Sequence, residues 1–539
     1  MKQRYEYTHF GVMLDMSRNA VMKVSEVKRM IDCLQKMGYN TLELYTEDTY
    51  EIKGEPYFGY MRGRYTGTEL KDIDAYARAR GIELIPCVQT LAHFTNLVRH
   101  RAYAEIVDCN DILLIDEPKT YELIDKIFAT LAENFTSRLV NIGMDEAHMV
   151  GLGKYLDKHG YQDRFQLLLR HLNKVVEIAK KYGFTPHMWS DMFFRLANKG
   201  GYYVQEVQKF PDEVIATVPE SVELAYWDYY HTKEKDYDVM FDTHAQFNRK
   251  VWFAGGVWSW NGFAPLNWYS VKSMKPAMQS VVKHGIKDVL LTLWGDDGKE
   301  CSYFSLLPSL YAIRQYADGN FDEDKIKKGF YSLFKIKYDD FMALDLPSRT
   351  GACNPDGEEI RQNACKCLLY ADPFMGIKDK AIVNVRPIPY TQHAATLKAA
   401  AKRAGDFAYL FDTLSKLCSV MATKAELSVK TRRAYEARDN KTLAGLIKDY
   451  AATEKALSVF YAAYRALWYK ENKAFGFEVQ DIRLGGLMQR LKNCRERLTA
   501  YVKGKISAID ELEQEILPHE ALNYFQYNNY AQTVSFNKL

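Results

Sequence analysis

The sequence predicts a (β/α)8 barrel followed by a mainly α-helical domain. From residue 7 to about residue 315, short apolar runs rich in β-formers alternate eight times with amphipathic helical stretches. After about residue 345 the chain becomes charged and rich in Ala, Lys, Glu and Leu, a composition that favours long helices. We therefore expect a barrel domain over residues 1–345 and a helical domain over residues 346–539.

The eight expected strands are short, nearly continuous apolar runs, which is typical of parallel strands that are buried on both faces. They cover residues 8–14, 41–45, 83–89, 139–143, 185–190, 222–227, 251–255 and 288–294. The helical repeats over 26–37 and 165–182 stop at Gly38 and Gly183, and Gly suits a left-handed helix end. In the second domain we expect helices from 392 to 517, the last of them over 491–516.

Carboxylates and tryptophans dominate the ends of the expected strands. In a barrel of this kind, chemistry lies at the C-terminal strand ends. Those positions are Asp15, Asp48, His93, Asp145 with Glu146, Trp189 with Asp191, Trp227 with Asp228, Trp258, and Trp294 with Asp296. Each tryptophan alone suits core packing, but several on one rim suit the walls of a sugar-binding site. We select Trp189, Trp227, Trp258 and Trp294 as such walls and interpret Trp252 as core.

Asp145 and Glu146 follow the apolar run 139–144, so we place both acids at the C-terminal tip of the fourth strand. An adjacent Asp-Glu pair also suits a helix start, where acids complement the dipole. Cleavage of a glycoside needs one protonated carboxyl group and a second group that handles positive charge at the sugar. We assign Glu146 as the acid and Asp145 as its ionised partner. His93, at the tip of the third strand, has two readings at this point: a lone histidine is more often structural, and the alternative is that it pairs with Asp48 and relays charge toward Glu146.

Composition excludes several classes of partner and cofactor. The 72 basic and 69 acidic residues among 539 leave a net charge of +3, which gives no general attraction to nucleic acid or to an anionic membrane. The N-terminus lacks an apolar signal core, no run could span a bilayer, and nine cysteines are scattered, so we expect a cytoplasmic protein. Cys365 and Cys367 have no second ligand pair nearby and read as structural. We expect no metal and no cofactor.

Three segments resemble glycoside hydrolase family 20, the β-N-acetylhexosaminidases: residues 11–18, 142–146 and 293–296. The segments 471–477 and 481–487 resemble a bacterial subgroup of that family with broad action on terminal GlcNAc and GalNAc. The resemblance covers the whole barrel. It implies an exo-acting, retaining enzyme whose partner is an oligosaccharide or glycoconjugate with a terminal N-acetylhexosamine.

The resemblance also implies roles for individual residues. The substrate's own acetamido oxygen would attack the anomeric carbon and form an oxazolinium intermediate, a mechanism in which the enzyme supplies no nucleophile. Asp145 would orient the acetamide, and Glu146 would act as acid and then as base. The remaining assignments are Asp48 and His93 as a supporting pair, Trp189, Trp227 and Trp294 as aromatic walls, and Asp296 in place of a Glu that binds sugar hydroxyls.

The chain departs from the family pattern at three points. Phe10 stands where many members have an Arg that grips the sugar's 3- and 4-hydroxyls, which leaves Arg18 as a candidate for that contact and suggests tolerance at O4. The strand-seven Tyr that binds the acetamide oxygen is not evident in 256–260, and Tyr229 or Tyr230 is expected to replace it. The small domain that often precedes the barrel is not expected here.

Two other functions stay open at this point. An exo-β-glucosaminidase would act on sugars without an acetamide, so it would need a second carboxylate about 5 Å from Glu146 as nucleophile. A catalytically silent carbohydrate-binding barrel would need no proton donor. The helical domain has two open roles, which are to close one side of the sugar site or to form a homodimer.

Overall fold

The computed structural model describes residues 5–351, 364–383, 387–517 and 530–535. The chain forms two compact units. The barrel unit comprises Met1–Val257, Ser270–Trp294 and Ser309–Ile326, and the helical unit comprises Trp258–Tyr269, Gly295–Pro308 and Lys327–Leu539. Two loops of the barrel sequence therefore pack with the later helices. The division expected between residues 345 and 346 stays a prediction.

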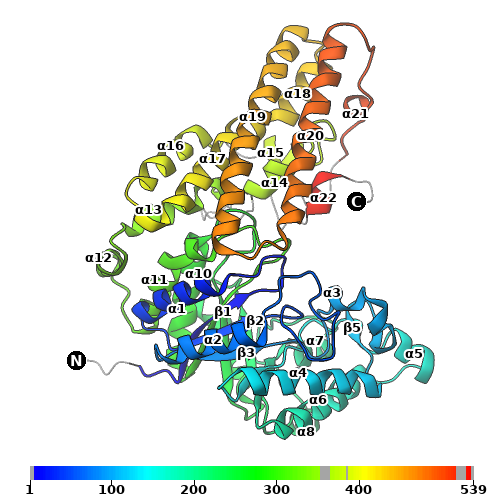
Figure 1. The fold of residues 1–539 in the computed structure, drawn as a ribbon, viewed down its shortest axis with the longest axis vertical. Helices are drawn as coiled ribbons and strands as arrows, with labels where there is room; N and C mark the ends of the chain where they lie inside the picture. The colour runs from blue at the N-terminus through cyan, green and yellow to red at the C-terminus, as the bar shows by residue number, and fades with distance from the viewer. Residues whose placement is uncertain (1–4, 352–363, 384–386, 518–529, 536–539) are drawn as a thin grey trace. The chain divides into compact units, whose positions relative to one another are not determined.

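Among the described residues, eight parallel strands close a barrel in the order β1-β10-β9-β8-β7-β6-β3-β2 (Figure 1). The strands are β1 (His9–Asp15), β2 (Thr41–Tyr45), β3 (Glu83–Cys87), β6 (Leu139–Asn141), β7 (Thr185–Trp189), β8 (Glu223–Asp228), β9 (Val251–Gly256) and β10 (Asp288–Leu293). The predicted barrel is confirmed. A short antiparallel pair, β4 (Val107–Cys109) and β5 (Ile112–Leu113), was not expected, because two or three residues carry no periodic signal.

Helices alternate with the strands and surround them, as α1, α4 and α6 illustrate in Figure 1. In chain order they are α1 (Val24–Met37), α2 (Gly67–Arg78), α3 (Thr95–Val98), α4 (Pro118–Asn134), α5 (Lys154–His159), α6 (Arg164–Lys181), α7 (Asp191–Ala197), α8 (Asp212–Thr217), α9 (Glu234–Ala245), α10 (Asn267–Lys283) and α11 (Leu307–Ala317). Helix α1 ends at Gly38 with a φ of 83°, the left-handed end that its sequence predicts.

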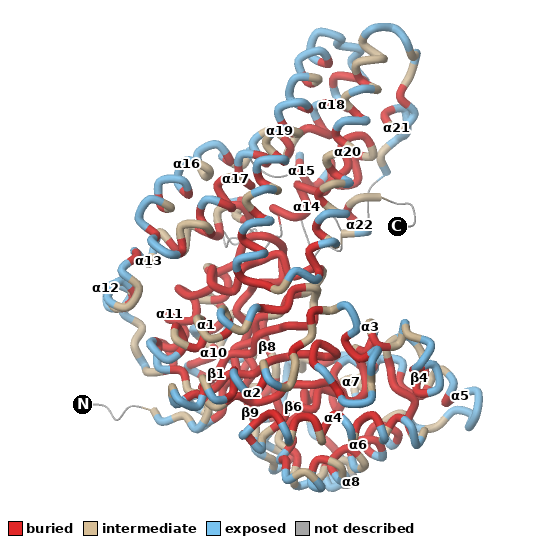
Figure 2. The backbone as a smooth tube through the Cα atoms, viewed as in Figure 1, coloured by how far each residue is buried: buried red, intermediate tan, exposed pale blue. Residues whose placement is uncertain are grey.

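The barrel interior is filled by side chains, and the strands are the most deeply buried part of this unit (Figure 2). Its core cluster consists of Met13, Tyr45, Ile85, Cys87, Trp189, Ala225, Trp252, Ala254 and Leu290. Trp252 is a core residue, as expected. Its indole stacks between His9 and His187, with ring centroids at 4.9 Å and 4.6 Å.

The helical unit contains long helices that pack lengthwise. The helices after the barrel are α12 (Glu323–Phe334), α13 (Tyr338–Met342), α14 (Ala364–Tyr370), α15 (Asp379–Val383), α16 (Tyr390–Ala401), α17 (Ala408–Lys424), α18 (Leu427–Glu436), α19 (Asn440–Glu471), α20 (Phe477–Val502), α21 (Asp510–Glu513) and α22 (Tyr530–Val534). The mainly helical second part is thus confirmed. The helix expected over 491–516 is wrong at both ends. Helix α20 begins after Gly476, which has a φ of 88°, and the chain turns after Val502, where the Lys505 N–H donates to the Ala500 carbonyl.

A buried charge cluster holds the loop of residues 297–300 inside the helical unit. Lys366 of α14 forms ion pairs with Asp297 and Glu300 at 2.7 Å and 3.1 Å, and Arg483 of α20 pairs with the same two carboxylates. The side chains of Lys366 and Glu300 are both 1% exposed. Cys365 and Cys367, on either side of this lysine, are buried and free.

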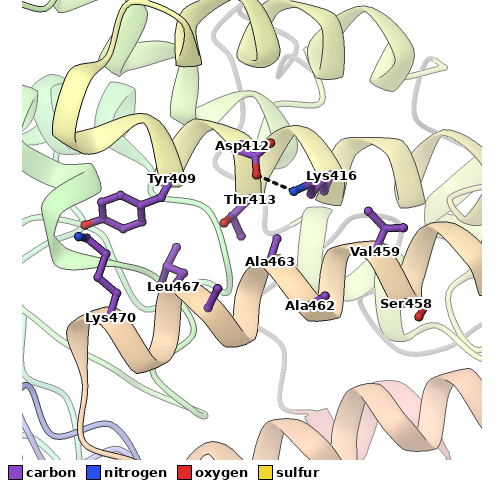
Figure 3. Close-up of a pocket in the computed structure, with 11 residues that line it drawn as sticks. Tyr409, Asp412, Thr413, Lys416, Ser458, Val459, Ala462, Ala463, Leu467 and Lys470 are labelled. Atoms are coloured by element: carbon purple, nitrogen blue, oxygen red, sulfur yellow. Dashed lines mark hydrogen bonds and ion pairs between the residues drawn. The ribbon is translucent and has the colours of Figure 1, made fainter.

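A surface groove of about 680 Å³ lies between α17 and α19 of the helical unit (Figure 3). Small side chains of α19 and an exposed pair on α17, Asp412 with Lys416 at 2.6 Å, line it. Within the described ranges, every helix is too short or too polar to cross a membrane.

Candidate active site

Asp145 and Glu146 follow β6 on a sharply turned backbone. Gly143, Met144 and Glu146 have φ angles of 71°, 68° and 50°, a left-handed conformation that costs free energy for the two residues other than glycine. The adjacent carboxylates both lie near His93 Nε2, at 3.1 Å and 3.9 Å, but they differ in exposure. The Asp145 side chain is 12% exposed, whereas that of Glu146 is 44% exposed.

The Asp145 carboxylate is held by one amide and one imidazole. Gln89 Nε2 donates to Oδ1 at 2.7 Å, and His93 Nε2 lies 3.1 Å from Oδ2. Burial alone would raise the pKa of Asp145, but the charge of His93 and the bond from Gln89 lower it. Burial likewise opposes the charged form of His93, yet the Asp145 carboxylate raises its pKa to about 10. The two groups therefore form an ionised pair.

Gln89 connects this pair to the neighbouring strands. Its Nε2 also donates to the Tyr45 hydroxyl at 3.0 Å, and its Oε1 accepts the Met144 N–H at 3.2 Å. The Tyr45 hydroxyl donates to Glu47 Oε1 at 3.0 Å, and Glu47 forms an ion pair with Arg18. One chain of contacts thus runs across the C-terminal ends of β1, β2, β3 and β6.

Glu146 faces a different set of groups. Its carboxylate lies 3.6 Å from the Arg195 guanidinium and 3.9 Å from His93, and its backbone N–H donates to Asp191 at 3.2 Å. Burial and then the charge of Asp145 raise the pKa of Glu146. The pKa values of the two adjacent acids are thus shifted in opposite directions, that of Asp145 down and that of Glu146 up.

Aromatic rings lie at the ends of β7, β8 and β10. Trp294 Nε1 donates to the Tyr229 hydroxyl at 3.0 Å, and the Tyr229 ring stacks on Trp227 with centroids at 5.3 Å. Trp227 and Trp294 are partly exposed, and Tyr230 is 40% exposed. Trp189 is only 1% exposed and belongs to the core, and its indole Nε1 has no hydrogen-bond partner among the described residues.

Three expectations about the site are wrong. Trp189, expected as a sugar wall, is packed in the barrel core instead. Asp48 forms an ion pair with Arg62 at 3.1 Å, while His93 pairs with Asp145, so the expected Asp48–His93 pair does not form. Phe10 lies near the start of β1, where its ring packs against Tyr7 and Tyr39. A side chain at the N-terminal end of a strand cannot reach the C-terminal rim, so Phe10 does not occupy the place of a sugar-gripping residue.

Other expected residues have mixed placements. Arg18, His93, Asp145 and Glu146 lie in one connected group of contacts, described above. Trp258 and Asp296 belong to the helical unit, where the Trp258 ring stacks on Trp260 at 4.3 Å. A role for Trp258 and Asp296 at the sugar site stays a prediction.

Three residues of this site were missed by sequence reasoning: Glu47, Gln89 and Arg195. Asp191 was noted at a strand end but was given no role. Glu47 and Gln89 sit within two residues of a strand end, the one signal that would have selected them. Arg195 carries no such signal, because it reaches the site from the second turn of α7. Within the described part of the chain, no group of three or more His, Cys, Asp or Glu side chains is arranged to hold a metal ion.

Two family models match this chain. Residues 7–240 match the model of the glycosyl hydrolase family 20 catalytic domain, and residues 339–530 match that of the glycoside hydrolase 20C C-terminal domain. Hexosaminidase D of Homo sapiens is 25% identical over 223 residues, 39% of this chain and 43% of that protein. A beta-hexosaminidase of Akkermansia muciniphila is 23% identical over 275 residues, 42% of this chain and 55% of that protein.

The matched segments thus span about half the length of these curated relatives. Among solved structures, an exo-β-N-acetylglucosaminidase of Vibrio harveyi is 18% identical with a TM-score of 0.48, over 61% of this chain and 58% of that chain. The two family models, one on the barrel sequence and one on the helices after it, together cover most of the sequence. The chain belongs to glycoside hydrolase family 20.

Proposed function

We propose that this chain is an exo-acting, retaining β-N-acetylhexosaminidase that removes terminal β-linked GlcNAc or GalNAc from an oligosaccharide or glycoconjugate. One observation carries the proposal. Asp145 is held in its ionised form by His93 and Gln89, while the adjacent Glu146 has a raised pKa and a more exposed side chain. The pKa values of two neighbouring acids are thereby shifted in opposite directions.

The proposed reaction has two steps. In the first, the acetamido oxygen of the substrate attacks the anomeric carbon, the glycosidic bond breaks, and the leaving oxygen takes the proton of Glu146. Asp145 accepts the acetamide N–H and stabilises the positive charge of the oxazolinium that forms. In the second, Glu146 takes a proton from water, whose oxygen attacks the anomeric carbon and opens the ring. Two inversions give net retention.

The carboxylates around Glu146 support a nucleophile from the substrate rather than from the enzyme. Asp145 is engaged by His93 and Gln89, and Asp191 and Glu47 are each paired with an arginine. An acetamide held in place makes the attack intramolecular, which can lower the reaction barrier by on the order of 7–11 kcal/mol.

We further propose which side chains bind the sugar. Trp227, Tyr229 and Trp294 are partly exposed or stacked aromatic groups that suit the apolar face of a pyranose ring. Arg18, at the C-terminal end of β1, suits the sugar hydroxyls because its guanidinium offers several donors beside Glu47.

The test is hydrolysis of the p-nitrophenyl β-glycosides of GlcNAc, GalNAc and glucosamine, with an acetamide-derived thiazoline as inhibitor. We expect cleavage of both acetylated sugars, strong inhibition by the thiazoline, and loss of turnover with retained ligand binding in Glu146→Gln. Activity on glucosamine alone would refute substrate assistance and favour an enzymic nucleophile. If the wild type binds the ligand but does not turn it over, the result would favour the alternative function, a catalytically silent carbohydrate-binding barrel.

A further inference from the structure

The buried carboxylate of Asp191 contacts both the backbone of Glu146 and Arg195, a cation that lies beside the Glu146 side chain. Asp191 Oδ2 accepts the Glu146 N–H at 3.2 Å and lies 2.8 Å from Arg195 Nε. Asp191 and Arg195 stand one turn apart on α7, so the helix fixes their spacing. The Asp191 side chain is fully buried, and its Oδ1 has no hydrogen-bond partner among the described residues.

The guanidinium of Arg195 has a fixed orientation because each of its nitrogens faces a different group. Nε faces Asp191, Nη1 donates to the Gly200 carbonyl at 3.2 Å, and Nη2 lies 3.6 Å from Glu146 Oε1. The rings of Tyr202 and Trp227 lie 5.8 Å from its centre. A planar fork with these partners cannot turn away from the acid without losing the other contacts.

We propose that Asp191 and Arg195 are positioning residues that set the protonation equilibrium of Glu146 and aim its carboxyl group. This inference rests on the proposed function, in which Glu146 must give up a proton in the first step and take one up in the second. Arg195 favours the ionised form that serves as base, while Asp145 and burial favour the protonated acid. The pair therefore keeps the residue able to perform both steps.

Charged groups from every neighbouring element bear on this equilibrium. Asp145 and Asp191 raise the pKa of Glu146, and His93, after β3, and Arg195 lower it. His148, two residues further along, also interacts with Glu146. Burial and then the charge of Asp145 raise the pKa of Asp191 to about 6, although Arg195 opposes this. Removing Arg195 thus takes away a cation and also leaves Asp191 without its counter-charge.

The test compares pH profiles of kcat/KM for p-nitrophenyl β-GlcNAc. In the free enzyme the alkaline limb reports loss of the Glu146 proton. We expect Arg195→Met to move this limb to higher pH, and Asp191→Asn to move it to lower pH, because Asn keeps an acceptor for the Glu146 N–H but removes a negative charge. Arg195→Lys should restore a limb close to the wild type. Each pH unit of movement corresponds to about tenfold in the protonated fraction above the limb.

Arg164→Met is the matched control. Arg164 of α6 braces the same loop through the carbonyls of His148 and Val150 but has no contact with the Glu146 carboxylate. This variant should lower stability or rate without moving the limb. A second readout, independent of turnover, is the ¹³C carboxyl titration of labelled glutamate, with the Glu146 signal assigned by Glu146→Gln.

The outcomes separate the two proposals. A wild type that cleaves no acetylated sugar would overturn the proposed function. A wild type that is active, with the limb and the ¹³C titration unchanged in Arg195→Met and Asp191→Asn, would overturn only the role of this pair. Shifts of the same sign in both variants would also overturn it, because the charges removed are opposite.

Discussion

Replacing Gly143 by alanine tests whether the turn after β6 is built around Gln89. An added Cβ would lie 2.1 Å from Gln89 Oε1 and 2.5 Å from its Cδ, so the amide must move. Gln89 is completely buried and makes three hydrogen bonds, to Asp145, Tyr45 and Met144, so a shift of its amide strains or breaks these bonds.

The substitution is expected to lower both the stability of the fold and the rate of the reaction. A left-handed alanine costs about 1 kcal/mol. Loss of the hydrogen bond to the charged Asp145 costs about 1.5–3 kcal/mol, and each neutral bond about 1 kcal/mol. Asp145 also loses the donor that orients it, and removal of one preorganised contact of this kind lowers the rate by about 10²-fold, or about 2.7 kcal/mol. We therefore expect Gly143→Ala to reduce kcat/KM on the order of 100-fold.

Gly183→Ala is the control, because Gly183 has a φ of 76° and no atom within 4 Å of an added Cβ. It should lower the melting temperature slightly and leave kcat/KM unchanged. In a double-mutant cycle, Gly143→Ala should cost little activity once Gln89→Ala has removed the obstructing side chain. The reasoning would be refuted by a Gly143→Ala enzyme within threefold of the wild type, or by effects of the two substitutions on activity that simply add.

Three further predictions concern other parts of the chain. Tyr229→Phe removes the acceptor of the Trp294 indole N–H, so it should lower the melting temperature slightly and lower kcat/KM about tenfold, or about 1.4 kcal/mol; a full-activity variant would exclude this contact from the site. Against the effect of burial, the Asp145 carboxylate raises the pKa of His93 from 6.5 to about 10. The charged form of His93 therefore stabilises the fold fully below pH 6.5, and this stabilisation is lost as the pH rises through 10. The melting-temperature difference between the wild type and His93→Gln should therefore be largest near pH 6 and shrink toward pH 10, and a constant difference would contradict the ionised pair. Lys366→Met leaves buried carboxylates without this cation and should cost about 3–5 kcal/mol in urea unfolding, whereas Lys416→Met, in an exposed pair, should change little; equal effects would contradict the assignment of a buried cluster.

The strands could be predicted closely because their signal is local. Parallel strands covered on both faces consist of continuous apolar runs, and β2 has the predicted bounds while β9 and β10 differ from theirs by one residue. β3 and β6 end two residues early, at Cys87 and Asn141. The reason is the site itself, because Gln89 and Gly143 have left the ladder to form the turn that carries Asp145.

Pairings between side chains could not be predicted in the same way. Reasoning along the chain paired Asp48 with His93, because both follow neighbouring strands. In the fold, Glu47 has a φ of 41°, and it is Glu47, not Asp48, that bonds Tyr45 and Arg18. Because of the left-handed turn at Glu47, the carboxylate that faces the site comes one residue earlier in the chain than the one predicted, Asp48.

The sequence by itself determined the barrel class, the helical character of the second part and the position of Asp145 and Glu146 at a strand tip. These follow from local periodicity and composition, which each segment carries on its own. Only the tertiary structure decided which groups control the two acids. Gln89 is 56 residues from Asp145 and Arg195 approaches Glu146 from a later helix, so their contacts depend on strand order and turn geometry rather than on any pattern within one segment.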